Sequence, residues 1–323
     1  MRHYASYFDA RYLVQGLTLY RSLERHERSF IWWVLCLDEE CRRMIERLAL
    51  PNVRAVPLAA LEAADPALLR ARADRSRVEY YFTLSPIWPR YVLDQAGVDG
   101  VTYLDSDLLF YSSPDPVFEE MGDASVEIVP HRFPDSLRHM ERHGIYNVGL
   151  IAYRNDARAR AVLDRWREQC LSWCFDRVEA GKFADQKYLD EWPSLPGVRV
   201  SRHPGVGLAP WNWMNYTIDV RGDAITVDGA PLVFFHFQGM KLFNAWLFQP
   251  SEATYPPMPR RLRTRLYGGY LSELAATKQW LARALPGAAL QHGTARYPRM
   301  STRQLLGQIW HGFLRPRIGS TPL

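Results

Sequence analysis

The sequence predicts an α/β fold with a doubly wound, mostly parallel central sheet, of the Rossmann-like kind. Apolar strand patterns alternate with amphipathic helix patterns through the first 130 residues, and residues 30–37 form a continuous apolar run. Such a run is typical of a parallel strand that helices cover on both faces. A third observation is a short apolar strand, residues 101–104, that ends in two acids one residue apart. Strand–helix alternation of this kind predicts a parallel sheet.

The predicted elements follow one another as such a sheet requires. Strands are expected at residues 3–8, 30–37, 53–56 and 101–104, with helices at about 12–27, 40–48, 57–73 and 86–95 between them. Further strands are expected at 125–129, 147–153 and 232–237, and a long helix at 156–173 that Asn155 or Asp156 would cap. Beyond residue 201 the sequence is rich in Pro and Gly, so loops are expected before the last of these strands.

Length and charge indicate one large domain with a basic appendage. The chain has 323 residues, of which 47% are hydrophobic and 23% charged, values typical of a folded protein. We divide it into a catalytic domain, residues 1–250, with halves of about 1–130 and 131–250, and a largely helical C-terminal region, 251–323. That region has 11 Arg and Lys against Glu252 and Glu273, a net charge of +9, so residues 1–250 carry −4 of the total +5. An acidic body without a reading motif argues against nucleic-acid binding.

The cysteines and the hydropathy pattern predict a cytoplasmic location. Cys36, Cys41, Cys170 and Cys174 lack C-x-x-C spacing, so buried free thiols in a reducing compartment are expected. The first residues have no long apolar core of the kind that a secretory signal needs. No apolar stretch reaches the roughly 18 residues of a transmembrane helix.

Asp105 and Asp107 stand at the carboxyl end of the strand at 101–104, where open α/β sheets bind ligands. Two ionised carboxylates held close together are costly without a cation. A hard divalent ion removes that cost and leaves coordination positions for phosphate oxygens. The alternative interpretation is a pair of solvated loop acids.

Four motifs then occur in the order of a known family: Tyr103-Leu104-Asp105-Ser106-Asp107, Tyr146-Asn147-Val148-Gly149-Leu150, Asp185-Gln186 and His236-Phe237-Gln238-Gly239-Met240-Lys241. Over residues 3–241 the set resembles the metal-dependent nucleotide-sugar glycosyltransferases of the GT-A fold, most closely the family 8 group of glycogenin and lipopolysaccharide galactosyltransferases. The resemblance implies transfer of a sugar, with retention, from a nucleoside-diphosphate sugar. The donor is expected to be UDP-linked and the acceptor a bacterial surface glycan or glycolipid.

The resemblance also implies roles for these residues. It makes Asp105, Asp107 and His236 ligands of Mn²⁺ or Mg²⁺, and an imidazole beside two carboxylates suits Mn²⁺ better. It places three catalytic residues at the transferred sugar: Asp185, Gln186 and Asn147. From the local sequence alone, His236 could be a core histidine, Asp185 a partner of a helix dipole and Asn147 a turn residue.

Donor binding is expected from Tyr7, Asp9, Tyr12, Arg77, Asp105, Gly149, Gly239 and Lys241. A tyrosine can stack on the base and Asp9 can accept hydrogen bonds from base or ribose, although Asp9 could equally cap the next helix. Glycine lets the backbone approach a pyrophosphate, and Lys241 offers a mobile positive charge. Lys241 follows Gly239 more closely than in the family's pattern, and the sequence around Arg77 also departs from it.

Two further features concern the acceptor. Trp211, Trp213 and Asn215 could form a platform for an acceptor sugar, or could simply pack their loop. In the C-terminal region, Arg260, Arg261, Arg263 and Arg265 cluster, and apolar residues between 305 and 314 recur at helical spacing beside Arg303, Arg315 and Arg317. This pattern indicates an interfacial basic helix on the anionic inner face of the membrane, with a helix pair docked on the domain as the alternative.

Two other functions stay open. A nucleotidyltransferase could also use paired aspartates on a strand and would release pyrophosphate, but no glycine-rich phosphate loop opens the chain. A non-catalytic glycan-binding relative could keep the fold, although intact Asp105, Asp107 and His236 argue against it.

Overall fold

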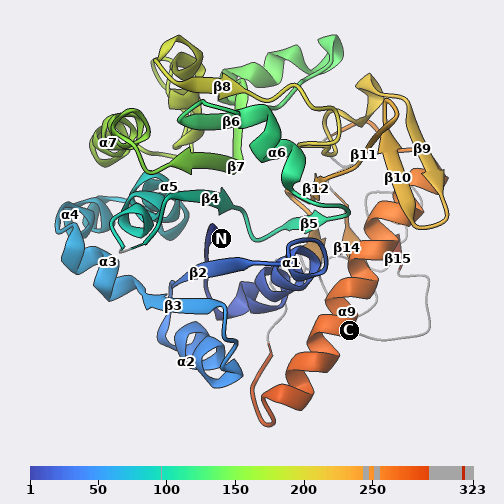
Figure 1. Cartoon of the computed structure of the whole chain (residues 1–323), viewed down its shortest axis with the longest axis horizontal. Helices are drawn as coiled ribbons and strands as arrows, with labels where there is room; N and C mark the ends of the chain where they lie inside the picture. Colours follow the sequence, from blue (N-terminus) through green and yellow to red (C-terminus); the bar gives the residue numbers. More distant parts are fainter. Residues whose placement is uncertain (96, 243–246, 251–254, 291–314, 317–323) are drawn as a thin grey trace, which may run out of the picture.

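The computed structural model describes residues 1–95, 97–242, 247–250, 255–290 and 315–316. A seven-stranded sheet runs through its centre in the order β3-β2-β1-β4-β7-β6-β8 (Figure 1). The strands are β1 (Arg2–Phe8), β2 (Phe30–Cys36), β3 (Val53–Pro57), β4 (Gly100–Leu104), β6 (Val126–Pro130), β7 (Tyr146–Arg154) and β8 (Val198–Val200). The first four strands pair in parallel, while β7 is antiparallel to both β4 and β6. The predicted fold class is thus confirmed, with β7 as the strand that makes the sheet mixed.

Helices cover both faces of the sheet. The structure has α1 (Leu13–His26), α2 (Glu39–Leu48), α3 (Leu58–Ala64), α4 (Ala67–Asp74), α5 (Arg77–Leu93), α6 (Asp115–Met121), α7 (Ala157–Ser172), α8 (Arg260–Arg263) and α9 (Gly269–Ala284). Buried residues of α1, α2, α6 and α9 join one hydrophobic core, and those of α3, α4, α5 and α7 join the other. This arrangement explains the continuous apolar run of β2, because both faces of that strand are covered.

Several predicted boundaries change. The helix expected at 86–95 begins nine residues earlier, because Ser76 forms a capping box with Glu79 and a buried apolar face carries α5 past Pro86 and Pro89. The helical stretch expected at 57–73 is two helices, α3 and α4, which a break at Asp65 and Pro66 separates. The segment expected to be loop contains a hairpin, β9 (Ile218–Arg221) with β10 (Ala224–Val227), which β11 (Ala230–Pro231) extends.

Short elements complete the fold. Among the described residues these include the strands β5 (Leu108–Phe110), β12 (Phe234–His236), β13 (Lys241–Leu242), β14 (Leu247–Gln249) and β15 (Arg315–Pro316). The 3-10 turns there are η1 (Ala10–Tyr12), η2 (Asp135–His143), η3 (Gln186–Ser194) and η4 (Trp213–Asn215), and a π-helical turn, Thr264–Gly268, joins α8 to α9. The pairing of β5 with β12 matters most for the site, since it joins the end of the central sheet to the last third of the chain.

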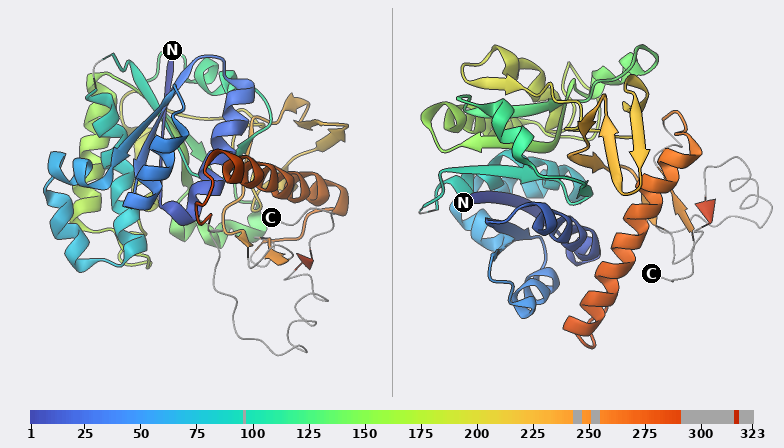
Figure 2. Two further views of the ribbon diagram at one scale, coloured as in Figure 1. Left: turned by 90° about the horizontal axis from the view of Figure 1, so that it is seen from below. Right: turned by 45° about the vertical axis from the view of Figure 1, so that its right-hand side comes forward.

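Helix α9 lies along the body formed by the described residues before position 250. Figure 2 shows it beside α1 and near the β9–β10 hairpin, and Arg25 of α1 forms an ion pair with Glu273 at 3.1 Å. Within the part of the chain that the structure describes, no helix is both long and apolar enough to cross a membrane. The amphipathic segment predicted at 303–317 falls almost wholly outside the described residues.

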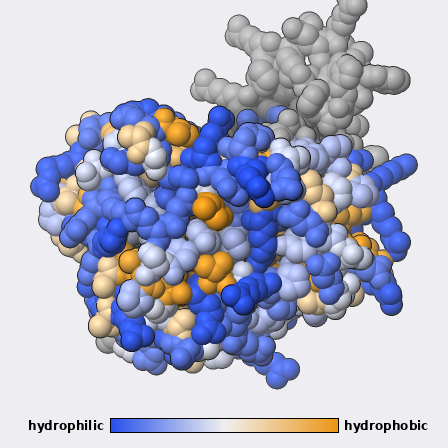
Figure 3. Space-filling view, turned by 90° about the horizontal axis from the view of Figure 1, so that it is seen from above, coloured by the Kyte–Doolittle hydropathy of each residue, from blue (hydrophilic) through white to orange (hydrophobic). Residues whose placement is uncertain are grey.

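Polar residues dominate the face shown in Figure 3, where hydrophobic ones form small separate patches. Most large apolar side chains are instead buried, chiefly in the two cores on either side of the sheet. The four cysteines are free and buried, as the sequence predicts.

Candidate active site

Three potential metal ligands converge at the end of β4. Asp105 and Asp107 follow this strand directly, and the chain then forms β5, which pairs antiparallel with β12 so that Leu108 lies opposite His236. Nε2 of His236 lies 3.1 Å from Oδ1 of Asp107 and 3.8 Å from Oδ2 of Asp105. One ligand atom from each of the three residues lies within 4.8 Å of the others. The structure therefore brings together the two acids and the imidazole that the sequence singled out.

The electrostatics of this group favour a cation. Burial raises the pKa of Asp105, and the neighbouring Asp107 adds to that effect while His236 opposes it. Burial alone would lower the pKa of His236, but the negative charges of Asp107 and Asp105 outweigh it and raise the value. Nε2 of His236 is buried and has no hydrogen bond of normal geometry. Two carboxylates and an unsatisfied imidazole nitrogen are a donor set that fits Mn²⁺ or Mg²⁺.

Asn147 and Gly149 lie behind His236. The backbone N–H of Gly149 donates to Oδ1 of Asn147 at 2.8 Å, and the same oxygen is 3.1 Å from Nδ1 of His236. A Cβ at Gly149 would lie 2.7 Å from Cε1 of His236, so the absent side chain makes room for the imidazole. The sequence predicted Asn147 at the transferred sugar and Gly149 at the donor. In the structure both residues pack against His236, and the two predicted roles stay predictions.

A cavity of about 480 Å³ opens beside the two aspartates. Several predicted donor-binding residues line it: Tyr7, Asp9, Tyr12, Arg77, Asp105 and Lys241. Other lining residues were missed by the sequence analysis, among them Arg11, Leu37, Val78, Tyr81, Phe82 and Met240. Three of these lie in the first turns of α5, and the Ser76–Glu79 capping box was the signal that could have placed them.

Two lining residues have additional structural partners. Asp9 accepts hydrogen bonds from the backbone N–H and the guanidinium of Arg11, so it caps the turn after β1, as the alternative interpretation held. The hydroxyl of Tyr7 lies 3.2 Å from Oγ of Ser85, and its ring packs on Tyr103 with centroids 5.6 Å apart. Tyr103 in turn donates to Oδ1 of Asp105 at 2.7 Å.

Gln186 is the first residue of the turn η3, and Asp185 directly precedes it. Asp185 is 5% exposed, and burial raises the pKa of its carboxyl to about 7. It follows Ala184, whose φ of 45° is unusual for a residue with a side chain. Gln186 donates from Nε2 to the carbonyl of His143 at 3.0 Å. Neither residue lines the cavity described above, although Asp185 lies near Tyr7, whose pKa is raised by burial and further by the charge of Asp185.

The predicted acceptor platform is only partly available. Trp211 is 2% exposed and packs edge-on against the rings of His131 and His236. We therefore assign it to the packing behind the metal group, which is Asp105, Asp107 and His236, instead of to a sugar. Trp213 donates to the carbonyl of Pro256 at 3.3 Å, and Asn215 donates to the carbonyl of Arg132 at 2.6 Å.

The turn after β12 contains Gly239 and leads to Lys241, two of the residues predicted to bind the donor. Gly239 has a φ of 76°, a conformation that glycine adopts without strain. The turn places Lys241 at the cavity next to Met240, and the Lys241 side chain is exposed.

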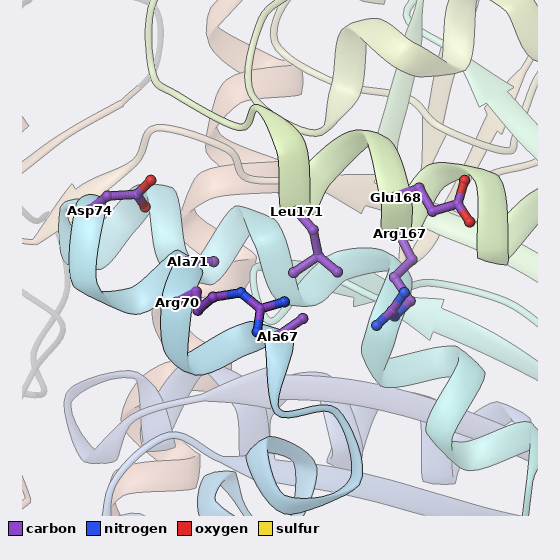
Figure 4. A pocket seen from close by; sticks show the side chains of 7 residues that line it. All are labelled: Ala67, Arg70, Ala71, Asp74, Arg167, Glu168 and Leu171. Atoms are coloured by element: carbon purple, nitrogen blue, oxygen red, sulfur yellow. The ribbon is translucent and has the colours of Figure 1, made fainter.

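A second hollow lies between α4 and α7 (Figure 4). It measures about 350 Å³ and is lined by Ala67, Arg70, Ala71, Asp74, Arg167, Glu168 and Leu171. The guanidinium of Arg167 is held by Asp65, with Nε 2.5 Å from Oδ2. The hollow has no metal-ligand group like that of Asp105, so we place the active site in the larger cavity.

Comparisons with known proteins give relatives and a fold. No model of a protein family matches the sequence. The uncharacterised protein YfnF of Bacillus subtilis is 34% identical over 76% of this chain and 84% of its own, and YfnD of the same organism is 29% identical over 78% and 84%. Among solved structures, the galactosyltransferase LgtC with donor and acceptor sugar analogues superposes with a TM-score of 0.50 at 15% identity, over 81% of this chain and 99% of LgtC. GlyE of Streptococcus pneumoniae has a TM-score of 0.49 at 15% identity, over 88% of this chain and 64% of GlyE.

Proposed function

The chain belongs to the family of Bacillus subtilis YfnF and has the GT-A glycosyltransferase fold, and from these premises we propose that it is a metal-dependent glycosyltransferase. It would move a sugar from a nucleoside-diphosphate sugar, with uridine as the expected nucleoside, to a glycan or glycolipid of the bacterial surface. The observation that carries the proposal is the buried Nε2 of His236, which lies beside two carboxylates at the edge of a cavity of about 480 Å³.

Asp105, Asp107 and His236 would hold Mn²⁺ or Mg²⁺, which when bound supplies positive charge against a diphosphate leaving group. Lys241 and Arg77 line the same cavity and would bind the phosphates. The aromatic side chains of Tyr7, Tyr12 and Tyr81 offer faces for the base and ribose.

From the resemblance of the motifs, the sugar itself would contact Asp185 and Gln186. These residues do not line the cavity of about 480 Å³, but Asp185 lies near Asp105, whose charge adds to the effect of burial in raising the pKa of Asp185. The carboxylate of Asp185 would accept hydrogen bonds from sugar hydroxyls and steady positive charge that develops at the anomeric carbon. Retention of the anomeric configuration is part of the proposal and rests on the resemblance of the four motifs.

The acceptor side is proposed from charge. Arg260, Arg261 and Arg265 line a groove of about 880 Å³ between the β9–β10 hairpin and the start of α9. With the basic composition of residues 251–323, this surface supports peripheral contact with anionic lipid, where a lipid-linked acceptor would be presented.

The decisive experiment incubates the protein with Mn²⁺ and a panel of UDP-, GDP- and dTDP-sugars. Release of a nucleoside diphosphate and a metal-dependent rise in melting temperature are expected, and Asp105→Asn should abolish both. Asp99→Asn is the matched control, because Asp99 is exposed just before β4 and does not line the cavity.

Each alternative gives a different outcome. Release of pyrophosphate would identify a nucleotidyltransferase, and sugar binding without turnover would identify a non-catalytic relative. If no nucleotide sugar binds, or if Asp105→Asn behaves like the wild-type protein, the proposal is wrong.

A further inference from the structure

A row of buried polar side chains continues from the metal group into the protein. His236, Asn147 and His131 are 3%, 7% and 4% exposed. Oδ1 of Asn147 lies 3.1 Å from Nδ1 of His236, and Nδ2 of Asn147 lies 3.1 Å from Nε2 of His131. The amide therefore bridges two imidazoles, of which only His236 faces the carboxylates.

The contact with Gly149 fixes the direction of every hydrogen bond in this row. The N–H of Gly149 can only donate, and it meets Oδ1 of Asn147 at 2.8 Å, so this atom is the carbonyl oxygen. That oxygen can only accept, and Nδ1 of His236 must therefore carry a proton. The amide nitrogen can only donate, so Nε2 of His131 must accept. In the neutral ring, Nε2 of His236 is then left with a lone pair on the side of Asp105 and Asp107.

We propose that His131 is a positioning residue, which acts through Asn147 to hold His236 with the Nε2 lone pair directed at the two carboxylates. The inference rests on the proposed function, because it assumes that this lone pair binds a cation. The tautomer and ring orientation of a metal-binding histidine are set by the hydrogen bond of its other nitrogen. His131 would accept the hydrogen bond from Nδ2 of Asn147 and so keep Oδ1 of Asn147 directed at Nδ1 of His236.

The surroundings of His131 suit this role. Its ring stacks on Phe133 with centroids 4.7 Å apart, and its carbonyl accepts hydrogen bonds from Trp211 at 2.8 Å and Asn212 at 2.9 Å. Burial lowers the pKa of His131 to about 3, so the ring stays neutral and able to accept. The next residue, Arg132, has a φ of 54° and donates from its guanidinium to the carbonyl of Val206 at 2.6 Å.

The packing also leaves little room for Asn147 and His236 to turn. Even a Cβ at Gly149 would lie 2.6 Å from Oδ1 of Asn147 and 2.8 Å from Nδ1 of His236. The orientation of the amide is thus maintained by hydrogen bonds at both ends and by close packing.

The test compares two substitutions of similar size at position 131. His131→Phe keeps an aromatic ring on Phe133 but removes the acceptor, whereas His131→Gln can place Oε1 where Nε2 stands. Long-range ¹H–¹⁵N NMR of the metal-free protein, at a pH where His236 is neutral, reports which ring nitrogen carries the proton. Titration with Mn²⁺, followed by calorimetry, reports the affinity, and thermal melting checks that each variant folds.

The wild-type protein should show the proton on Nδ1 of His236. His131→Phe should move it toward Nε2 and weaken Mn²⁺ binding by roughly 10-fold to 100-fold, and His131→Gln should restore both. A wild-type proton on Nε2, or a folded His131→Phe variant with unchanged tautomer and Mn²⁺ affinity, would overturn the inference. Equal losses in the Phe and Gln variants would also overturn it, because they would indicate a packing role.

If His131→Phe does not fold, the wild-type spectrum and Asn147→Leu decide the question by the same two readouts. Failure of the proposed function is distinguishable, because the wild-type protein would then show no Mn²⁺ binding whatever tautomer the spectrum reports.

Discussion

Gly149 shows how a single residue can determine whether the metal group forms. It lies in β7, antiparallel to β4, and its carbonyl accepts a hydrogen bond from the backbone N–H of Asp105 at 2.9 Å. A Cβ at this position would lie 2.6 Å from Oδ1 of Asn147 and 2.8 Å from Nδ1 of His236. Neither neighbour can move freely, because each is buried and hydrogen-bonded to the other.

We therefore expect Gly149→Ala to weaken Mn²⁺ binding and to lower the free energy of unfolding by about 1–3 kcal/mol, as an overpacked core does. Urea denaturation and Mn²⁺ titration measure the two effects. Gly269→Ala in α9 is the control, since a Cβ there would meet no atom within 4 Å, and it should be neutral or stabilising. Equal Mn²⁺ affinity in both variants would contradict the steric argument.

The side chain of Glu127 is a buried carboxyl group outside the site. It lies in β6, is 0% exposed, and its carboxylate oxygens form no hydrogen bond of normal geometry with the described residues. Burial, followed by the nearby charge of Glu120, raises the pKa of Glu127 to about 8. The folded protein therefore keeps this proton to a higher pH than the unfolded chain does.

This difference makes stability depend on pH. Between the ordinary glutamate pKa of 4.5 and about 8, the unfolded chain binds fewer protons, so the free energy of unfolding falls as pH rises. Glu127→Gln should remove the contribution of Glu127 to that fall, and comparison of urea denaturation of the two proteins at about pH 5 and about pH 8 would measure it. Glu119→Gln, at an exposed position of α6, removes the same charge and should keep the wild-type profile. If the wild-type and Glu127→Gln profiles run parallel, the buried acid does not titrate in this range.

At the scale of elements, two three-residue strands assemble the site. β5 follows Asp107 at once, and its pairing with β12 brings His236 next to the acids although the two segments are far apart in sequence. The backbone N–H of Phe237 also donates to the carbonyl of Asp107 at 2.9 Å. These strands are too short to fold alone, so their register depends on the core around them.

Helix α5 supplies one wall of the cavity through its first turns. Arg77, Val78, Tyr81 and Phe82 line the cavity, so the start of this helix fixes where they lie. The start is marked by the capping box, in which the backbone N–H of Ser76 donates to Glu79 at 2.9 Å. A stable first turn is therefore a condition for this wall.

Removal of the cap should weaken that turn. Ser76→Ala is expected to lower the free energy of unfolding by about 0.5–2 kcal/mol, whereas Ser76→Asp keeps an acceptor and should be close to neutral. Urea denaturation of the three proteins measures the difference. Should Ser76→Ala and Ser76→Asp be equally stable, the cap contributes nothing to this helix.

Across the whole molecule, helix α9 packs against the end of β12, the strand that carries His236. The ring of Tyr270 in α9 stacks on Phe237, next to His236, with centroids 4.0 Å apart and planes 10° apart. Tyr270 is 2% exposed and belongs to the same hydrophobic core as β12 and α1. The basic C-terminal region thus contributes to the core of the catalytic body as far as α9.

Loss of the Tyr270 ring should destabilise the protein. Tyr270→Ala is expected to lower the free energy of unfolding by about 3–5 kcal/mol through the cavity it leaves. Tyr270→Phe keeps the ring, and the buried hydroxyl of Tyr270 has no hydrogen-bond partner among the described residues, so this control should be neutral or stabilising. Thermal and urea denaturation of the two variants would show whether the stack or the hydroxyl matters.

Much of the fold could be predicted because the relevant signals are local. The apolar run at residues 30–37, the alternation before residue 130 and the cap at Asp156 correspond to β2, the parallel half of the sheet and α7. The prediction failed for α5, where Pro86 suggested a helix start, and for the β9–β10 hairpin, where Pro and Gly suggested loop. In α5 the capping box at Ser76 and the buried apolar face outweighed the signal of Pro86, and in the hairpin Gly222 stands in the turn between the two strands.

The candidate site, too, could be predicted from the sequence only in part. Strand pattern and side-chain type are properties of short segments, so they were enough to predict the fold class and to single out Asp105, Asp107 and His236 as candidate metal ligands. That Nε2 of His236 meets both acids, that Asn147 and His131 stand behind it, and that Trp211 is buried could be seen only in the folded chain. These relations depend on pairing between β5, β7 and β12, and strand register over such distances is set by burial in a shared core.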